Sequence, residues 1–187
     1  MAEVLILTGP PASGKTTVAV ALAERYDRVA HIDVDVVRHF VTPTGFAKPG
    51  SPERRHQRLL GARNASALAR NFLADRFGAI IDECFDEPDL LPVFLEELKP
   101  ANADIHVVTL MPSLAACEAR DVERRKAGRP AGWIRADYER FVKFGSQLPG
   151  STIDSSGLTP YETADRLQAL TTSGESIVLR APGHLTP

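Results

Sequence analysis

A chain of 187 residues, with 43% hydrophobic and 25% charged residues, has the size and composition of one globular domain with a sizeable core. This composition excludes a disordered chain, a collagen-like repeat and a coiled coil. The formal net charge of −2 argues against a surface that is basic overall, so we do not expect a nucleic-acid partner. The two cysteines, Cys84 and Cys117, support neither a disulfide framework nor a cysteine-rich zinc site.

Signals of membrane insertion and of secretion are both missing from the sequence. No apolar run approaches the roughly 18–20 residues of a membrane span. The N-terminal stretch MAEVLILTG has no basic leader and no cleavage site, so we expect no signal peptide. With so few cysteines, these features predict a cytoplasmic protein, and they leave the oligomeric state open.

Short apolar runs alternate with helical patterns along the chain. Five runs are expected to form strands, at residues 4–7, 29–32, 79–81, 105–110 and 152–154. Helices are expected at residues 15–26, 51–76, 88–98, 114–126 and 136–144, with one more that begins at Pro160. The helix at 51–76 carries an apolar stripe made of Leu60, Ala65, Leu68, Ala69, Phe72 and Leu73. Thr159 and Glu162 form a capping box around Pro160 at the start of the last helix.

The alternation of strands and helices predicts an α/β domain with a parallel sheet over residues 1–174, followed by a C-terminal tail at 175–187. The tail holds one strand-like run at residues 176–179. In parallel sheets of this kind, ligands bind beyond the carboxyl ends of the strands. The residues that directly follow each strand are therefore the candidates for function.

A glycine-rich loop after the first strand matches the pattern G-x-x-x-x-G-K-S/T. It reads Gly9-Pro10-Pro11-Ala12-Ser13-Gly14-Lys15-Thr16, and Thr17 follows on the helix. The glycines permit a tight turn whose N–H groups point at phosphate oxygens, and the following helix adds a partial positive charge. Lys15 is expected to reach the β- and γ-phosphates, and the Thr16 hydroxyl is expected to bind Mg²⁺. The loop therefore predicts binding of ATP with Mg²⁺.

Two carboxylates and an arginine follow the second strand. Asp33 and Asp35 are two residues apart, so they share a face if the segment is extended, and Arg38 lies one helical turn beyond Asp35. One carboxylate can deprotonate an attacking hydroxyl while the other holds water on Mg²⁺. Arg38 can fix a polar or anionic acceptor. The alternative is that Asp33 or Asp35 simply caps a helix.

Two more carboxylates, Asp82 and Glu83, follow the third strand. Taken alone, this pair is typical of the magnesium-binding strand of an ATPase, with Glu83 as the base that activates water. Taken with Asp33 and Asp35, we expect Asp82 and Glu83 to line the acceptor site or to support Mg²⁺. Two solvated loop carboxylates are the alternative.

A polar segment at residues 118–130 follows the fourth strand. Arg120 and Arg124 are four residues apart and lie on one helical face. Mobile arginines that close over the phosphates can supply much of the electrostatic stabilisation of phosphoryl transfer. A solvated charged helix with internal ion pairs is the alternative.

The loop, the stretch from Asp33 to Arg38 and the arginine-rich segment together resemble the small P-loop kinases, and most of all the chloramphenicol phosphotransferase and tunicamycin-resistance group. The resemblance covers nearly all of residues 1–172. It implies a three-layer P-loop NTPase sandwich with a five-stranded parallel sheet in the order 2-3-1-4-5. It also implies a short lid at about 121–132, and residues 42–76 would cover the acceptor.

The same resemblance assigns roles to individual residues. The catalytic base of the family corresponds to Asp35, with Asp33 as a second candidate for that role and as the metal-binding carboxylate. Arg120 would pack on adenine, while Arg124 and Arg129 would contact phosphates, with Arg124 and Lys15 taking part in catalysis. The residues at 156–159 would flank the base.

The activity implied is an ATP-dependent transfer of the γ-phosphate to a hydroxyl of a small molecule, with a tunicamycin- or chloramphenicol-like antibiotic as the specific candidate. Arg38, Asp82 and Glu83 would bind this acceptor together with Asp35. The alternatives are an ATPase that uses Asp82 and Glu83, a nucleotide sensor without activity, and a nucleic-acid 5′-hydroxyl kinase. The spacing of Asp35 and Arg38 also resembles the acceptor side of adenylylsulfate and polynucleotide kinases.

Overall fold

The computed structural model describes residues 3–41, 47–48, 50–85, 87, 89–124, 132–145 and 147–182. Its strands are β1 (Val4–Thr8), β2 (Val29–Asp33), β3 (Gly78–Asp82), β4 (Ile105–Leu110), β5 (Ser151–Ile153) and β6 (Ile177–Leu179). Its α-helices are α1 (Lys15–Ala23), α2 (Val34–Arg38), α3 (Pro52–Ala74), α4 (Leu90–Leu98), α5 (Leu114–Arg124), α6 (Trp133–Gly145) and α7 (Pro160–Ser173). A 3₁₀ turn, η1 (Lys99–Ala101), follows α4. No helix within these ranges is both long and apolar enough to cross a membrane.

Five parallel strands form the sheet in the order β2-β3-β1-β4-β5, which confirms the predicted fold. Strands β1, β3 and β4 are largely apolar and buried along their whole length, because helices cover both faces of the sheet. The register places Leu7 of β1 beside Asp82 of β3, and Asp82 beside Asp33 of β2. The polar ends of these neighbouring strands therefore meet at one edge of the sheet.

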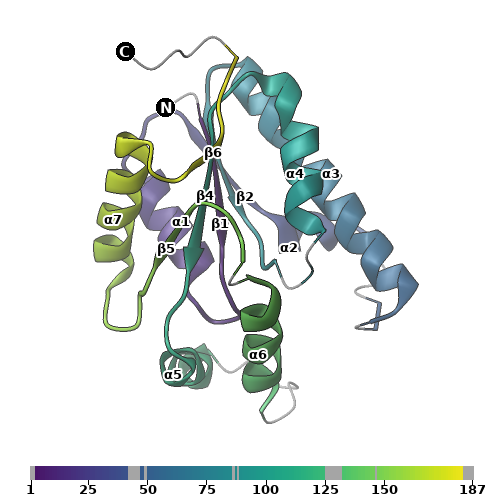
Figure 1. Ribbon diagram of the computed structural model, residues 1–187, viewed down its shortest axis with the longest axis vertical. Coiled ribbons are helices and arrows are strands. Elements are labelled where there is room, and N and C mark those ends of the chain that lie inside the picture. The colour runs from purple at the N-terminus through teal and green to yellow at the C-terminus, as the bar shows by residue number, and fades with distance from the viewer. Residues whose placement is uncertain are drawn as a thin grey trace.

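Two apolar layers enclose the sheet. Alternate residues of β1 point to opposite faces, so Val4 and Ile6 join the core beneath α3 and α4, while Leu5 and Leu7 join the core beneath α1 and α7. Figure 1 shows α1 and α7 on one side of the sheet and α3 and α4 on the other, with α5 and α6 beyond the carboxyl ends of the strands. The loops that follow the strands lie at that end of the sheet, together with α5 and α6.

Helix α2 begins directly after β2, where the sequence suggested an extended segment. The Asp33 carboxylate caps this helix, since its Oδ1 accepts hydrogen bonds from the backbone N–H groups of Asp35 (2.9 Å) and Val36 (3.3 Å). An aspartate at the N-cap satisfies N–H groups that would otherwise lack partners. The interpretation that Asp33 and Asp35 share one face of an extended chain is therefore wrong, because Asp35 lies inside a helical turn.

The sheet gains a sixth strand from the segment that we assigned to the tail. Strand β6 pairs antiparallel with β4 and aligns Leu179 with Ile105. A buried histidine of β4, His106, contacts the residue that precedes β6. Its Nδ1 lies 2.8 Å from the Ser176 hydroxyl, and its Nε2 lies 3.6 Å from a carboxylate oxygen of Glu3.

The stability of the fold is expected to fall in mild acid because of His106. Burial lowers the pKa of this imidazole from its ordinary value of 6.5, an effect that Asp104 opposes and Arg180 reinforces. The unfolded chain therefore binds a proton more readily, so stability is fully present above pH 6.5 and declines as the pH falls toward the pKa of the folded state. Urea unfolding between pH 8 and pH 5 should show this slope, and His106→Gln should reduce it.

The matched control is His56→Gln, which removes an exposed histidine on α3 and should keep the wild-type slope. An identical slope in wild type and His106→Gln would contradict the prediction.

Candidate active site

The loop between β1 and α1 folds back on itself through unusual backbone angles. A Cβ at Gly9 would stand 2.3 Å from the carbonyl oxygen of Leu110, so only glycine fits there. Gly14 (φ +93°) and Ala12 (φ +60°) take left-handed conformations, and Gly14 is the N-cap of α1. Such turns direct successive backbone N–H groups into one concave surface that suits an anion.

Lys15 places its charge over this concave surface. Its Nζ donates hydrogen bonds to the carbonyl oxygens of Gly9 (3.0 Å) and Pro10 (3.2 Å), so the side chain folds back across the loop. The first turn of α1 carries no acidic residue, and Thr16 and Thr17 are exposed there. The helix N-terminus and the ammonium group together favour a negatively charged ligand.

A pocket of about 190 Å³ opens on the β5 side of the loop. Arg120 of α5 forms its edge: one guanidinium nitrogen donates to the Ser13 carbonyl (3.0 Å) and another to the Ser155 carbonyl (2.6 Å). Leu158 and Thr163 line the opposite wall. Arg120 thereby joins the loop to the β5–α7 connection, and the pocket lies next to the concave surface that Lys15 covers.

On the other side of the loop, Asp33 lies among charged groups. Burial raises the pKa of the Asp33 carboxyl, and the neighbouring Asp82 carboxylate raises it further, while a backbone N–H and the charges of His31 and Lys15 act in the opposite direction. Asp82 is buried, and its Oδ2 lies 3.6 Å from His31 Nε2. The strand ends therefore bring Lys15, Asp33 and Asp82 close enough to influence one another's charge.

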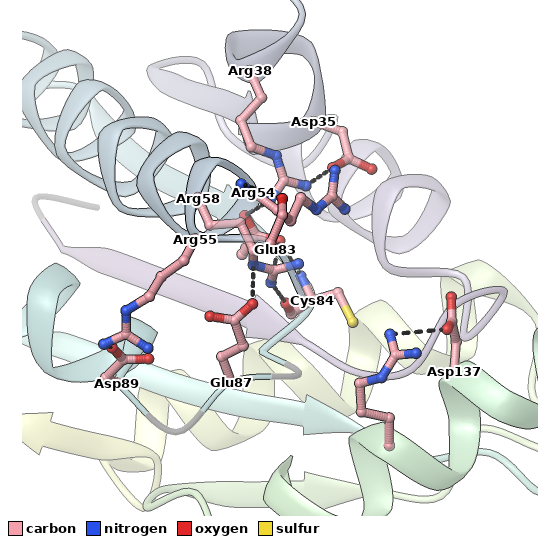
Figure 2. Close-up of polar contacts among 12 residues, drawn as sticks. Asp35, Arg38, Arg54, Arg55, Arg58, Glu83, Cys84, Glu87, Asp89 and Asp137 are labelled. Atoms are coloured by element: carbon pink, nitrogen blue, oxygen red, sulfur yellow. Dashed lines mark hydrogen bonds and ion pairs between the residues drawn. The ribbon is translucent and has the colours of Figure 1, made fainter. Parts of the chain in front are cut away.

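Asp35, Arg38 and Glu83 form a second polar cluster (Figure 2). The Arg38 guanidinium bonds the Asp35 carboxylate through one nitrogen and lies 3.2 Å from Glu83 Oε2 through another. The side chains of Arg38 and Glu83 are 4% and 2% exposed, whereas that of Asp35 is 64% exposed. A buried pair thus supports an accessible carboxylate.

Sequence reasoning missed Arg58 of α3, which belongs to this cluster. Its guanidinium lies 3.6 Å from Glu83 Oε1 and donates a hydrogen bond to the carbonyl of Cys84. The predicted helix at 51–76 gave no reason to single out one arginine among several. The available signal is that Arg58 shares a helical face with Gly61, Ala62 and Ala65, all of which are buried.

Some predicted site residues fall outside what the structure describes. Arg129 is one of them, and nothing is described of the Arg124 side chain. The predicted lid and the predicted acceptor cover are described only in part, without residues 125–131, 42–46 and 49. Within the described ranges, no group of three or more His, Cys, Asp and Glu residues is arranged to hold a metal ion by itself.

The chain is similar to a known protein family and to several solved structures. Residues 4–143 match the model of a family described as an AAA domain. No curated protein sequence matches the chain.

Solved structures share the fold. The tunicamycin resistance protein of Deinococcus radiodurans aligns with a TM-score of 0.66 at 18% identity, covering 95% of this chain and 98% of that one. The APS kinase of Mycobacterium tuberculosis, solved with AMPPNP and APS, gives 0.66 at 20% identity, covering 91% and 97%. The shikimate kinase of Bacteroides thetaiotaomicron gives 0.66 at 21%, covering 91% and 98%. At these identities the likeness establishes the fold, and it confirms the predicted P-loop kinase-like architecture.

Proposed function

The chain belongs to the AAA domain family of P-loop, kinase-like proteins, and from this premise we propose that it transfers the γ-phosphate of ATP to a hydroxyl of a small molecule. One observation carries the proposal. An accessible carboxylate, Asp35, lies two residues beyond Asp33, whose pKa is raised by burial and lowered in part by the charge of Lys15, and a buried arginine bonds Asp35. A kinase needs a phosphate-binding loop and an exposed carboxylate that can accept the proton of the attacking hydroxyl.

ATP fits the loop and the adjoining pocket. The residues from Gly9 to Thr17 would hold the phosphates, with Lys15 on the β- and γ-phosphates, and Arg120 would lie against the base in the pocket beside Leu158. Arg124 and Arg129 would contact the phosphates from the lid. Support comes from the concave loop, the N-terminus of α1 and the lysine that crosses them.

Mg²⁺ prefers oxygen ligands, and we propose Thr16 and Asp33 as the residues that supply them. The Thr16 hydroxyl lies in the exposed first turn of α1, and Asp33 caps α2 through Oδ1, which leaves Oδ2 for another partner. These residues would hold the cation, which would neutralise charge on the transferring phosphate when bound. Asp33 must be ionised for this, so the raised pKa of its carboxyl predicts weaker metal binding in acid.

The transfer step uses Asp35 as the base. Asp35 would accept the proton of the acceptor hydroxyl while the oxygen of that hydroxyl forms a bond to the γ-phosphorus and the bond to ADP breaks. Arg38 would keep the carboxylate in place, and Asp82 would contribute negative charge near the acceptor. The ATPase alternative assigns proton abstraction from water to Glu83, but the burial of Glu83 between two arginines argues against that role.

The acceptor is proposed to be a small molecule, with a tunicamycin- or chloramphenicol-like antibiotic as the first candidate. The tunicamycin resistance protein that shares the fold supports this choice. We also propose a cytoplasmic location, because a chain with only two cysteines offers no disulfide framework.

A mass-spectrometric screen tests the proposal. The full chain is incubated with ATP and Mg²⁺ and with tunicamycin, chloramphenicol, aminoglycosides, nucleosides, shikimate, adenylylsulfate or a 5′-hydroxyl oligonucleotide. A gain of one phosphoryl group on a small molecule is the expected result, and reactions without ATP are the control. Transfer to the oligonucleotide alone would identify a nucleic-acid kinase. Release of ADP with every acceptor unmodified would favour the ATPase, and binding of ATP without turnover would favour a nucleotide sensor.

A further inference from the structure

A buried network of charges lies beneath Asp35. We propose that Glu83 is a positioning residue for phosphoryl transfer: it is the shared partner of Arg38 and Arg58, and through Arg38 it fixes the direction of the Asp35 carboxylate. The inference rests on the proposed kinase function, which it deepens by giving Glu83 a role other than acceptor binding or water activation.

Three separate parts of the chain meet at the Glu83 carboxylate (Figure 2). Arg38 from α2 approaches Oε2 at 3.2 Å, and Arg58 from α3 approaches Oε1 at 3.6 Å. The backbone N–H of Cys84 donates to Oε1 at 2.8 Å. Arg58 is held in turn by the Cys84 carbonyl and lies 3.8 Å from Glu87. Each oxygen of Glu83 thus faces a guanidinium group from a different helix.

The residues proposed to position Asp35 are buried, whereas Asp35 itself is exposed. Glu83, Arg38 and Arg58 all have side chains at or below 4% exposed, whereas Asp35 is open to solvent. A carboxylate buried to this degree cannot meet a diffusing acceptor. It can, however, bind an arginine and restrict the orientation of its planar, always charged guanidinium group. Arg38 spans the two environments, since one end of its guanidinium bonds Asp35 and the other faces Glu83.

The Arg38 side chain packs against a glycine of α3. A Cβ at Gly61 would stand 2.6 Å from Arg38 Cγ and 3.1 Å from Arg38 Cδ. Glycine is a poor residue for a helix interior, where alanine is preferred. Here the missing side chain lets the stem of Arg38 pass against α3. This contact is independent of any charge, and a larger residue at position 61 would displace the stem of Arg38.

Two variants of the full chain test the role of Glu83. Glu83→Gln keeps the shape of the side chain and removes its charge, while Gly61→Ala keeps every charge and displaces Arg38. The control is Glu97→Gln, which removes a carboxylate that lies 3.3 Å from another α3 arginine, Arg70, at the far end of the helix. For each variant we would measure the ATP dissociation constant, the melting temperature, and kcat with the acceptor that the wild type phosphorylates fastest in the screen.

The expected result is a loss in kcat with little change in nucleotide binding. Both variants should bind ATP within about twofold of wild type and lose roughly 10–10²-fold in kcat, because a small misplacement of a reacting group has effects of this size. Glu97→Gln should match wild type in both. A folded Glu83→Gln or Gly61→Ala enzyme with wild-type kcat would overturn the inference, as would a loss of ATP affinity as large as the loss of kcat.

An arginine side-chain ¹⁵N spectrum separates failure of the inference from failure of the proposed function. If the wild type phosphorylates no acceptor, the kinase proposal fails, and this spectrum still decides whether Glu83 holds Arg38. The Nε–H signal of Arg38, assigned with Arg38→Lys, should exchange slowly with water in wild type and in Glu97→Gln. It should exchange rapidly in Glu83→Gln and in Gly61→Ala. A slowly exchanging Arg38 signal in Glu83→Gln would overturn the inference.

Discussion

Replacement of Lys15 by alanine is expected to reduce ATP-dependent phosphoryl transfer by at least about 10²–10³-fold, the range observed when one preorganised charge stabiliser is removed from an active site. The Lys15 ammonium reaches across the loop to the carbonyls of Gly9 and Pro10, and in the proposed function it binds the β- and γ-phosphates. Without it, the N-terminus of α1 and the backbone N–H groups would bind phosphates, but the transferring group would lose the positive charge of the ammonium.

Isothermal titration with ATP and Mg²⁺ and the acceptor assay would measure the two effects of Lys15→Ala separately. Lys99→Ala is the matched control, because Lys99 is exposed, pairs with Glu96 and lies in the 3₁₀ turn after α4. It should behave as wild type. Unchanged turnover in Lys15→Ala would remove the loop from the reaction and with it the kinase proposal.

The features that local sequence can encode were predicted well. The loop from Gly9 to Thr16 is a contiguous motif, and each of its unusual backbone angles falls where a small residue stands. The capping box of α7 was read from Thr159 and Glu162, and both of its hydrogen bonds are present. The buried strands were visible as apolar runs because both faces of the sheet are covered.

Helix α3 shows where the pattern held only in part. Of its predicted apolar stripe, Ala65 and Ala69 are buried, whereas Leu68 and Phe72 are 37% and 38% exposed. The small residues of the buried face let the helix approach its neighbours closely. Apolar periodicity alone does not distinguish these closely packed small residues from the larger, exposed members of the stripe.

The ion network escaped prediction for a different reason. Arg58 and Glu83 are far apart in the sequence, and no spacing rule links an arginine inside a long helix to a carboxylate after a strand. From its strand alone, Glu83 is interpreted as a water-activating base; together with Asp33 and Asp35 it is expected to line the acceptor site or support Mg²⁺. The structure brings Arg38 and Arg58 to either side of it, and this pairing depends on how α2 and α3 pack. Helix α2 itself has only five residues, too few for a periodic pattern.

The second large effect is expected for Asp35→Asn, which should retain ATP binding and lose roughly 10²–10⁴-fold in phosphoryl transfer, the usual contribution of a general base. The asparagine keeps the shape of the side chain and a partner for Arg38, but its amide cannot accept the acceptor proton. Asp165→Asn is the matched control, because Asp165 is also an exposed carboxylate paired with an arginine, Arg25, and it does not line the pocket beside the loop.

The comparison of the two asparagine variants assigns the role of Asp35. Transfer and ATP affinity are measured together, with Asp165→Asn expected to match wild type in both. A selective loss of transfer in Asp35→Asn supports proton abstraction, since the residues proposed to bind the nucleotide, Lys15 and Arg120, are unchanged. A loss of ATP affinity of the same size would instead make Asp35 part of the nucleotide or metal site. In that case Asp33, whose carboxyl pKa is raised by burial and lowered in part by the charge of Lys15, would be the remaining candidate for the base.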